Sequence, residues 1–485
     1  MDTNSLETRQ DNPGDNKQVI YRAATELADL LARGELTAKE VMRAHLDRIA
    51  DVNPEIKAIC TLLPEEDALA LAEDADQRRA SGASIGPLHG LPIAVKDLSS
   101  TRGMRTTMGS PIFKDHIPTE DALLVQRLKA AGALVIGKTN TPEFGVGSHT
   151  FNRIFGITRN PYDTSKSAGG SSGGAAAALA CGMLPLADGS DMGGSLRNPA
   201  AFCNVVGFRP SMGRVPAWPN VMAWQSRLGI EGPMARSVED CALLLSVLAG
   251  PDERDPMSIQ GDPQQFRQDL SYDFSKARLG WTPDLGLLPV ASEIVDTCAA
   301  TLPHWRDCGF DIDNDCPNMA GAMESFEVLR ASFYAQIAGP LLAEHRHEMK
   351  DTLIQNIESG LNLTATDITR ADAHRTQLYQ NILRFFDTHD FLILPSTQVA
   401  PFPVEHEWVE EIAGIPQNSY LDWMSICCII TLFGLPAISI PCGFTKAGLP
   451  VGLQIVGRPR ADLDVLRAAY ALEQATAYGK RRPAL

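Results

Sequence analysis

Hydrophobic positions along the chain alternate between helical spacing and short continuous runs. Leu27, Leu30 and Leu31 fall on one face of a helix, and an Ala-, Leu- and Glu-rich stretch at 66–80 predicts another. Few apolar runs of strand length occur before residue 85. We therefore predict an N-terminal helical segment over residues 18–82.

From residue 85 the pattern changes to strand, helix and strand. Residues 91–95 form an apolar run that ends at Lys96, a helix is predicted over 119–131, and 133–136 form a second apolar run. This alternation favours an α/β protein with a parallel or mixed sheet. Without a repeat or a clear linker, the chain is expected to be one large α/β/α domain, with a mixed central sheet between helical layers. Later segments fit this class, with predicted helices over 237–250, 320–390 and 461–477 and predicted strands at 391–394, 436–440 and 453–456.

Two serine–glycine clusters flank a strong helix former at 175–181. They read SAGGSSGG over 167–174 and DGSDMGGS over 188–195. Glycines at this density are expected where the backbone turns sharply, and successive N–H groups in such a turn can converge on an anion. A serine at its end would lie where an oxyanion forms during acyl transfer. A phosphate loop is excluded, because no lysine follows the glycines.

The residues alone leave several uses for these serines open. Ser172 matches the G-x-S-x-G elbow of a Ser-His-Asp hydrolase, but the preceding segment 160–167 looks turn-like. The downstream histidines lie in helical or loop stretches without distinguishing context. Alternatively the serines act with a buried lysine, whose pKa desolvation lowers. Lys96 is the candidate and Lys138 its rival, although a strand-end lysine can also be only a structural residue. The glycine-rich turn can likewise serve only to pack a helix against the sheet.

Several long motifs resemble the amidase signature family. They are GLPIAVKDL around Lys96, GKTNTPEFG after it, and AGGSSGG followed by SDMGGSLRNPAAFCNVVGF. The C-terminal stretch FGLPAISIPCGFTKAGLPVGLQIVG is also similar. The resemblance implies an amidase domain over 18–485. Its parts would be a signature core at 86–250, a variable and largely helical substrate-side region at 251–425, and C-terminal strands and a helix at 426–485.

The resemblance also implies roles for individual residues. Ser195 would be the nucleophile, and Ser171, joined to its neighbour by a cis peptide, would connect it to the base Lys96. The implied oxyanion hole consists of the backbone N–H groups of Met192, Gly193, Gly194 and Ser195. The implied supporting residues are Ser172, Asp191 and Arg197. The activity would be hydrolysis of a carboxylic amide to an acid and ammonia or an amine, without a cofactor or a metal.

The substrate is less defined. Loop 215–225 lies where members of the family line the substrate pocket, and its Trp218, Met222 and Trp224 would suit an aryl or bulky apolar group. The same residues could equally cover the core. Three alternatives stay open: a glutaminase-like subunit of a tRNA-dependent amidotransferase, a Ser-His-Asp esterase using Ser172, and a non-catalytic binding protein. The last is disfavoured because Lys96, Ser171 and Ser195 are all present.

Net charge and cysteine spacing limit which binding partners and which metal or redox sites are expected. The 485 residues carry 43 Lys and Arg against 59 Asp and Glu, a net charge of −16, which disfavours nucleic acids and anionic membranes. The ten cysteines show no C-x-x-C spacing, so neither a zinc nor a redox site is expected. Residues 1–17 are polar, lack signal-peptide features and are expected to be disordered. We expect a cytoplasmic enzyme, without a membrane segment, whose partner is a small-molecule amide; the family resemblance is also compatible with a homodimer.

Overall fold

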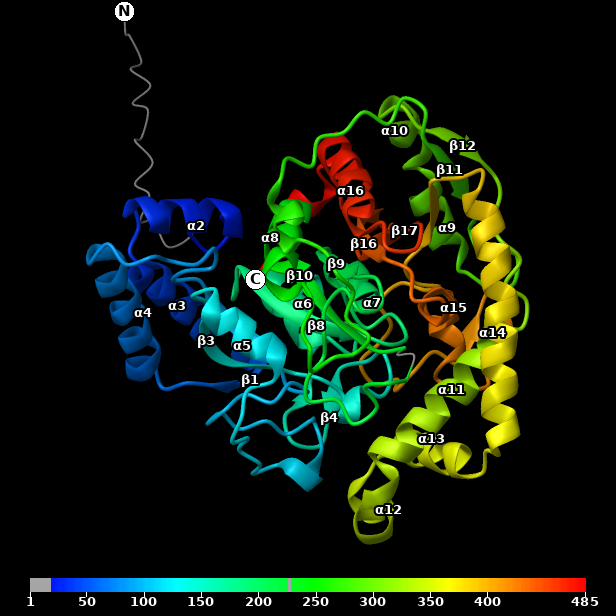
Figure 1. The fold of residues 1–485 in the computed structure, drawn as a ribbon, viewed down its shortest axis with the longest axis horizontal. Coiled ribbons are helices and arrows are strands. Elements are labelled where there is room, and N and C mark those ends of the chain that lie inside the picture. Colours follow the sequence, from blue (N-terminus) through cyan, green and yellow to red (C-terminus); the bar gives the residue numbers. More distant parts are fainter. Residues whose placement is uncertain (1–18, 226–227) are drawn as a thin grey trace, which may run out of the picture.

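A large mixed β-sheet between helices forms the centre of the computed structural model, which describes residues 19–225 and 228–485 (Figure 1). Strands β12, β11 and β13 are parallel, and every other pair of neighbours is antiparallel. This confirms the predicted α/β class. The predicted disorder of residues 1–17 lies outside the described residues. In spatial order the strands are β12 (Asp311–Asp313), β11 (Arg278–Trp281), β13 (Phe391–Pro395), β17 (Pro450–Gly457), β16 (Ala437–Phe444), β9 (Val206–Arg209), β10 (Ile230–Ala235) and β8 (Leu186–Asp191).

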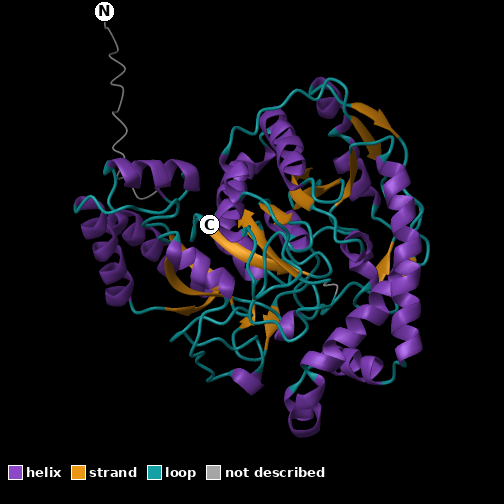
Figure 2. Ribbon diagram, viewed as in Figure 1, coloured by secondary structure: helices purple, strands orange, loops and turns teal. Residues whose placement is uncertain are grey.

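Helices cover both faces of this sheet, as the alternation along β17 shows. A methyl group on Gly452 would lie 2.6 Å from Ala201 of α7, whereas one on Gly457 would lie 2.4 Å from Val465 of α16. These two positions are an odd number of residues apart and therefore face opposite sides of the sheet. Figure 2 shows the strands enclosed by helices. The surrounding helices are α6 (Gly173–Ala180), α7 (Arg197–Cys203), α8 (Val238–Leu248), α9 (Ser292–Ala299), α10 (Leu302–Asp307) and α16 (Asp462–Thr476).

The N-terminal segment is helical, as predicted, and lies at one edge of the molecule (Figure 1). A second, three-stranded sheet joins it to the main body, with β2 parallel to β3 and β1 antiparallel to β3. The elements are α2 (Ala24–Arg33), α3 (Ala38–Ile56), β1 (Ile59–Leu62), α4 (Glu65–Ala80), β2 (Pro92–Lys96), α5 (Leu123–Ala130) and β3 (Leu134–Thr139). Helix α5 begins four residues later than the predicted 119–131, because Asp121 instead accepts a hydrogen bond from the Arg102 amide at 2.7 Å.

Two other predictions need correction. Residues 160–167 are not only a turn, because β6 (Arg159–Asn160) and β7 (Asp163–Ser167) pair as a small antiparallel hairpin. The region 251–425 supplies the predicted strand at 391–394, which is β13, and also two strands of the large sheet that were not predicted, β11 and β12. Short strands of three to five residues carry little periodicity, which explains why β11 and β12 were not predicted. The helices of this part are α11 (Ala322–Ile337), α12 (Gly339–His345), α13 (Asp351–Leu361), α14 (Ala365–Phe386) and α15 (Ser425–Leu432).

Two clusters of buried apolar side chains form the core. One extends from the N-terminal helices to α16, and the other lies among α11, α13, α14 and α15. The turn that follows β8 lies between them: Leu196 belongs to the first cluster, and Met192 packs against the second. The second serine–glycine cluster is thus held from two sides.

Candidate active site

Lys96 lies buried at the end of β2, with its amine among serine hydroxyls. Its Nζ donates hydrogen bonds to Ser171 Oγ and Ser172 Oγ, both at 2.8 Å, and to Ser190 Oγ at 3.0 Å. Burial lowers the pKa of Lys96 to about 7, although Asp188, Asp191 and Glu231 act in the opposite direction. A lysine with this pKa is partly neutral near pH 7 and can accept a proton.

Lys138, the rival base, points the other way. It lies in β3 opposite Val95, whereas Lys96 is opposite Thr139, so the two lysine side chains leave opposite faces of the small sheet. Its Nζ donates to the Ser99 carbonyl oxygen at 2.5 Å and to Thr101 Oγ1 at 2.9 Å. The structure therefore brings Lys96, and not Lys138, to the serine–glycine clusters.

Of the three predicted catalytic residues, Lys96 and Ser171 are hydrogen-bonded to each other, whereas the side chain of Ser195 is hydrogen-bonded to neither within the described residues. The peptide bond between Gly170 and Ser171 is cis, as predicted. Ser172 donates its backbone N–H to the Ser195 carbonyl oxygen at 3.3 Å, which brings the two clusters together. Among the hydrogen bonds of the described residues, none joins Ser171 Oγ to Ser195 Oγ. Ser195 itself keeps 6% of its surface exposed, so that its side chain is not fully enclosed.

A buried ion-pair network fixes the turn that carries Ser195. Both oxygens of the Asp191 carboxylate are bound by Arg197, through Nη2 at 2.8 Å and Nε at 2.9 Å, and Arg209 pairs with the same group at 3.2 Å. Burial alone would raise the pKa of Asp191, but these cations and the Gly194 amide hold it below its usual value. Asp191 and Arg197, which the family resemblance implies as supporting residues, are thus bound to each other, and Asp191 also accepts the N–H of Gly194 in the turn.

The predicted oxyanion donors are not equivalent. Gly194 has a φ of 99°, which a residue with a side chain adopts only with strain, and its N–H donates to Asp191 Oδ1 at 2.9 Å. In the described part of the chain, the N–H groups of Met192, Gly193 and Ser195 have no hydrogen-bond acceptor. Three of the four amides are therefore available to a ligand, and the fourth holds the turn.

Two residues near Lys96 were missed by the sequence reasoning. Ser190 Oγ accepts a hydrogen bond from Lys96 Nζ, and Asp188 Oδ1 accepts one from the Lys96 backbone N–H at 3.0 Å. Both lie in the DGSDMGGS segment that the sequence singled out. No local pattern marks them, because residues 186–191 of β8 read LADGSD and are nearly all buried, without the alternation of a half-exposed strand.

The elbow hypothesis receives no support from these contacts. The side chain of Ser172 contacts Lys96 and Ser190, and no histidine of the described chain is among its hydrogen-bond partners. The histidine at this cluster is His149, which contacts Ser167 Oγ at 2.7 Å and the Val404 carbonyl oxygen at 3.2 Å. His149 therefore contacts Ser167 and not Ser172, the serine of the elbow hypothesis.

Loop 215–225 leaves its aromatic side chains near solvent. Trp224 is 83% exposed, Trp218 is 37% exposed and Met222 is half-buried. The chain returns from this loop beside the site, because a methyl group on Gly229 would lie 3.3 Å from Met192 Cε. The two tryptophans therefore do not cover the core, and no hydrogen bond joins this loop to Lys96 or Ser195 among the described residues.

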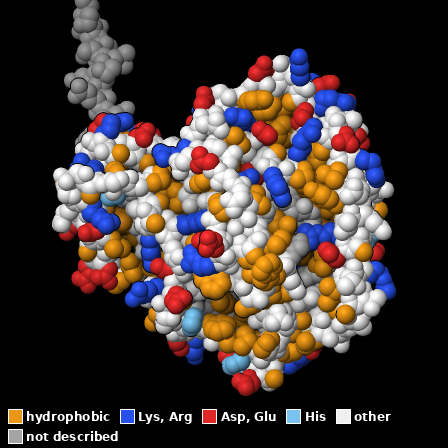
Figure 3. Space-filling model, viewed as in Figure 1, with side chains coloured by type: hydrophobic (Ala, Val, Ile, Leu, Met, Phe, Trp, Pro, Cys, Tyr) orange, Lys and Arg blue, Asp and Glu red, His pale blue; other side chains and the backbone are white. Residues whose placement is uncertain are grey.

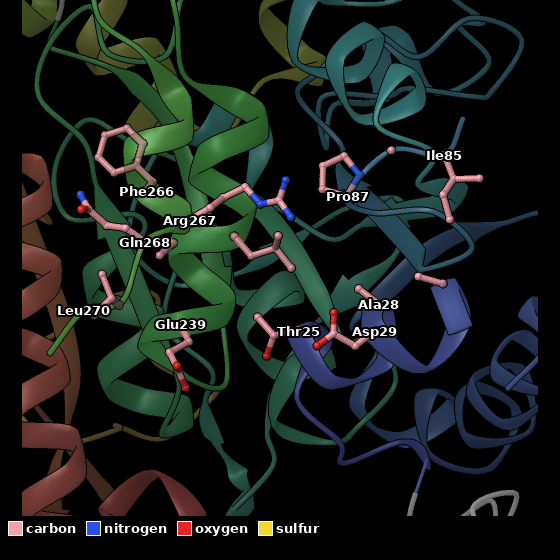
Figure 4. Close-up of a pocket in the computed structure, with 14 residues that line it drawn as sticks. Thr25, Ala28, Asp29, Ile85, Pro87, Glu239, Phe266, Arg267, Gln268 and Leu270 are labelled. Carbon is pink, nitrogen blue, oxygen red and sulfur yellow. The ribbon is translucent and has the colours of Figure 1, made fainter. Parts of the chain in front are cut away.

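Other surface features lie apart from this centre. A cavity of about 420 Å³ lies beside the contact of α2 with α8, and its lining includes Thr25 and Asp29 of α2 and Arg267 (Figure 4). Its lining includes neither Lys96 nor Ser195. The face drawn in Figure 3 mixes acidic and basic side chains with apolar ones. Within 19–225 and 228–485, no helix has the length and apolar character needed to cross a membrane, and no group of three His, Cys, Asp or Glu could hold a metal.

Known proteins resemble this chain over nearly its whole length. A family model described as Amidase matches residues 40–466. The acylamidase of Rhodococcus erythropolis is 37% identical over 96% of this chain and 97% of its own length. A glutamyl-tRNA(Gln) amidotransferase subunit of Moorella thermoacetica is also 37% identical, over 96% and 99%. Among solved structures, a bacterial aryl acylamidase of the amidase signature family matches with a TM-score of 0.88 at 29% identity, covering 96% of this chain and 98% of that one. A 6-aminohexanoate cyclic dimer hydrolase matches with a TM-score of 0.85 at 27% identity, over 96% and 99%.

Proposed function

The chain belongs to the amidase signature family and is an enzyme that hydrolyses amide C–N bonds, and we propose that it does so through an acyl-enzyme on Ser195. The observation that supports this most is the environment of Lys96. Its amine is buried, has a pKa lowered to about 7 and donates to Ser171 Oγ at 2.8 Å. The next residue, Ser172, contacts the Ser195 carbonyl oxygen through its backbone N–H. A neutral amine in this place can take a proton from Ser171.

Each proton in the proposed reaction moves along one chain of groups. Ser195 Oγ attacks the amide carbonyl carbon while its proton passes to Ser171 Oγ, and the Ser171 proton passes to Lys96 Nζ. Lys96 returns the proton through Ser171 to the leaving nitrogen, the C–N bond breaks, and the amine or ammonia leaves. Water then attacks the Ser195 ester by the same route and releases the acid. The Ser171–Ser195 contact forms in the substrate-bound enzyme, since catalytic hydrogen bonds commonly tighten there.

The oxyanion of the intermediate is bound by backbone N–H groups. Met192, Gly193 and Ser195 supply the donors, because their amides have no other acceptor within the described residues. Gly194 acts differently: its N–H holds the Asp191 carboxylate and so fixes the conformation of the turn. Donors held in advance by a rigid turn stabilise developing charge without reorganising during the reaction.

For the substrate we propose an aryl or bulky apolar amide. Buried core side chains fill the space on one side of the turn, since a methyl group on Gly193 would lie 2.6 Å from Met424 Cε, 3.1 Å from Cys428 Sγ and 3.7 Å from Phe326 Cζ. Phe144 and Met192 are only partly buried against the same apolar cluster. Side chains of this kind favour an apolar group next to the reacting carbonyl. The structural similarity to an aryl acylamidase supports the same class.

A second candidate function is that of a glutaminase component in a tRNA-dependent amidotransferase. It is favoured by the equal identity, 37%, to the Rhodococcus acylamidase and to the Moorella amidotransferase protein. A panel of an anilide, a bulky aliphatic amide and glutamine, each tested with the purified chain alone, separates the two. The apolar surroundings predict the highest kcat/KM with the anilide. Hydrolysis of glutamine alone would favour the second function.

The mechanism is tested by trapping the nucleophile. The purified enzyme is treated with a fluorophosphonate, and the modified peptide is identified by mass spectrometry. We expect modification at Ser195 that is lost in Lys96→Ala. Modification at Ser172, or equal labelling of the wild type and Lys96→Ala, would overturn the proposed Ser-Ser-Lys relay. Trp224→Ala adds a test of the loop: a raised KM for the anilide without loss of stability supports substrate contact, and an unchanged KM removes Trp224 from the pocket.

A further inference from the structure

Asp188 holds a buried carboxylate directly behind the base. It lies in β8, at the edge of the large sheet, and its Oδ1 accepts the backbone N–H of Lys96 in β2 at 3.0 Å. The Asp188 side chain therefore connects the large sheet to the small one. That connection alone requires only an uncharged acceptor, which an asparagine would supply equally well.

Burying a charged carboxylate at this position costs folding free energy unless nearby positive charges compensate for it. Asp188 is fully buried, and burial raises its pKa to about 6, while Lys96 of β2 and Lys138 of β3 act to keep it ionised. The groups that face Lys96 are Asp188 and Asp191 of β8 and Glu231 of β10. Of these, Asp191 is already paired with Arg197 and Arg209, and Glu231 is only half-buried. Asp188 is the carboxylate of the three that hydrogen-bonds to Lys96 itself, through the backbone N–H.

We propose that Asp188 is a positioning residue whose negative charge, held against the Lys96 backbone, sets the basicity of the catalytic lysine. This inference rests on the proposed function, in which neutral Lys96 is the base. Without the charge, the ammonium form of Lys96 would lose a negatively charged neighbour that stabilises it. The lysine would then become neutral at lower pH and would also be a weaker base.

The test is the pH profile of kcat/KM in Asp188→Asn, which keeps the hydrogen-bond acceptor and removes the charge. The acid limb is the part of the profile in which kcat/KM rises with pH, and we expect it to move about one pH unit lower. We also expect the plateau of kcat/KM at high pH to fall about two- to tenfold. A role limited to joining the sheets predicts no movement of the limb, and that result would overturn the proposal. Asp240→Asn is the matched control, since Asp240 is also buried but binds Thr25 of α2. It should leave the limb in place.

Two further measurements keep the test decisive. If Asp188→Asn does not fold, Asp188→Ser removes the same charge and must show the same shift. The pH dependence of Ser195 labelling by the fluorophosphonate is recorded for every variant. Failure of labelling in the wild type would defeat the proposed function itself, whereas normal labelling with an unmoved limb in the Asp188 variants would defeat only the role of Asp188.

Discussion

The ends of β2 and β3 carry two lysines that resemble each other in almost every respect. Lys96 and Lys138 end neighbouring parallel strands, both are buried, and burial lowers the pKa of the first to about 7 and of the second to about 8. Their partners differ. Lys96 contacts three hydroxyls of the two serine–glycine clusters, whereas Lys138 donates to the Ser99 carbonyl oxygen and to the Thr101 hydroxyl, on the other face of the small sheet. Burial and strand position are therefore common to both lysines, and what distinguishes them is which hydroxyls each one contacts.

The largest expected difference is in activity. Lys96→Ala should lower kcat/KM for an amide by at least about 10³-fold, because the proton acceptor is lost. Lys138→Ala should stay within about tenfold of the wild type, since its amine faces away from the serines. Steady-state kinetics on folded proteins, verified by circular dichroism, measure both. Similar losses in the two variants would abolish the distinction.

The hydroxyls around Lys96 can be separated next. Ser171 and Ser172 lie at the same distance from Nζ, 2.8 Å, but only Ser171 is proposed to pass the proton. We expect Ser171→Ala to lose about 10²-fold or more in kcat and Ser172→Ala about tenfold. Single-turnover acylation of both variants gives the comparison. A greater loss in Ser172→Ala would transfer the relay to that residue.

Stability should show the reverse order. In Lys138→Met the Ser99 carbonyl oxygen loses its lysine donor inside the protein, which should cost about 1–3 kcal/mol of unfolding free energy. In Lys96→Met the three serine hydroxyls can hydrogen-bond to one another, so the change should stay within about 1 kcal/mol. Urea unfolding followed by fluorescence measures the difference. A less stable Lys96→Met would show that its amine, too, serves the fold.

The smallest expected effect concerns pH. In the wild type, kcat/KM should rise with pH through about 7, because the ammonium form of Lys96 cannot accept a proton and the neutral form can. Besides burial, the groups that shift the pKa of Lys96 are Asp188, Asp191 and Glu231. Lys138→Met should move the limb toward lower pH by less than Asp188→Asn does, because Lys138 acts on Lys96 only by helping to keep Asp188 ionised. A larger shift would mean that the two lysines titrate together.

The parts of the site that could be predicted are those with a dense local signal. The serine–glycine clusters and the strand that ends at Lys96 are legible in the sequence, and with the family motifs they point to Lys96, Ser171 and Ser195. Asp188 was missed because its importance comes from the contact of β8 with a strand nearly a hundred positions away, which no local pattern encodes. The amide of Gly194 was assigned to the oxyanion, because a sequence cannot show that Asp191 already binds it.

The fold shows the same division. The long amphipathic helices and the apolar strands β2, β13, β16 and β17 have periodic or continuous patterns and were predicted near their observed bounds. Strands β8, β9 and β10 contain glycine or arginine at buried positions, so their patterns resemble loops. Such residues are buried there because Arg209 pairs with Asp191 and because α7 packs closely on β9. Tertiary contacts, and not local preference, determine these strands.

The place of β17 affects how the enzyme is made. This strand lies between β13 and β16, near the middle of the large sheet, yet it is synthesised after every other strand. Until residues 450–457 leave the ribosome, the strands that precede them can form only two separate partial sheets, and Arg197 lacks its hydrogen-bond partner Gln454. Insertion of this last strand joins the two partial sheets and completes the support of the catalytic turn. The large sheet, and with it the hydrogen bond from Arg197 to Gln454, is therefore completed only by the strand that is synthesised last.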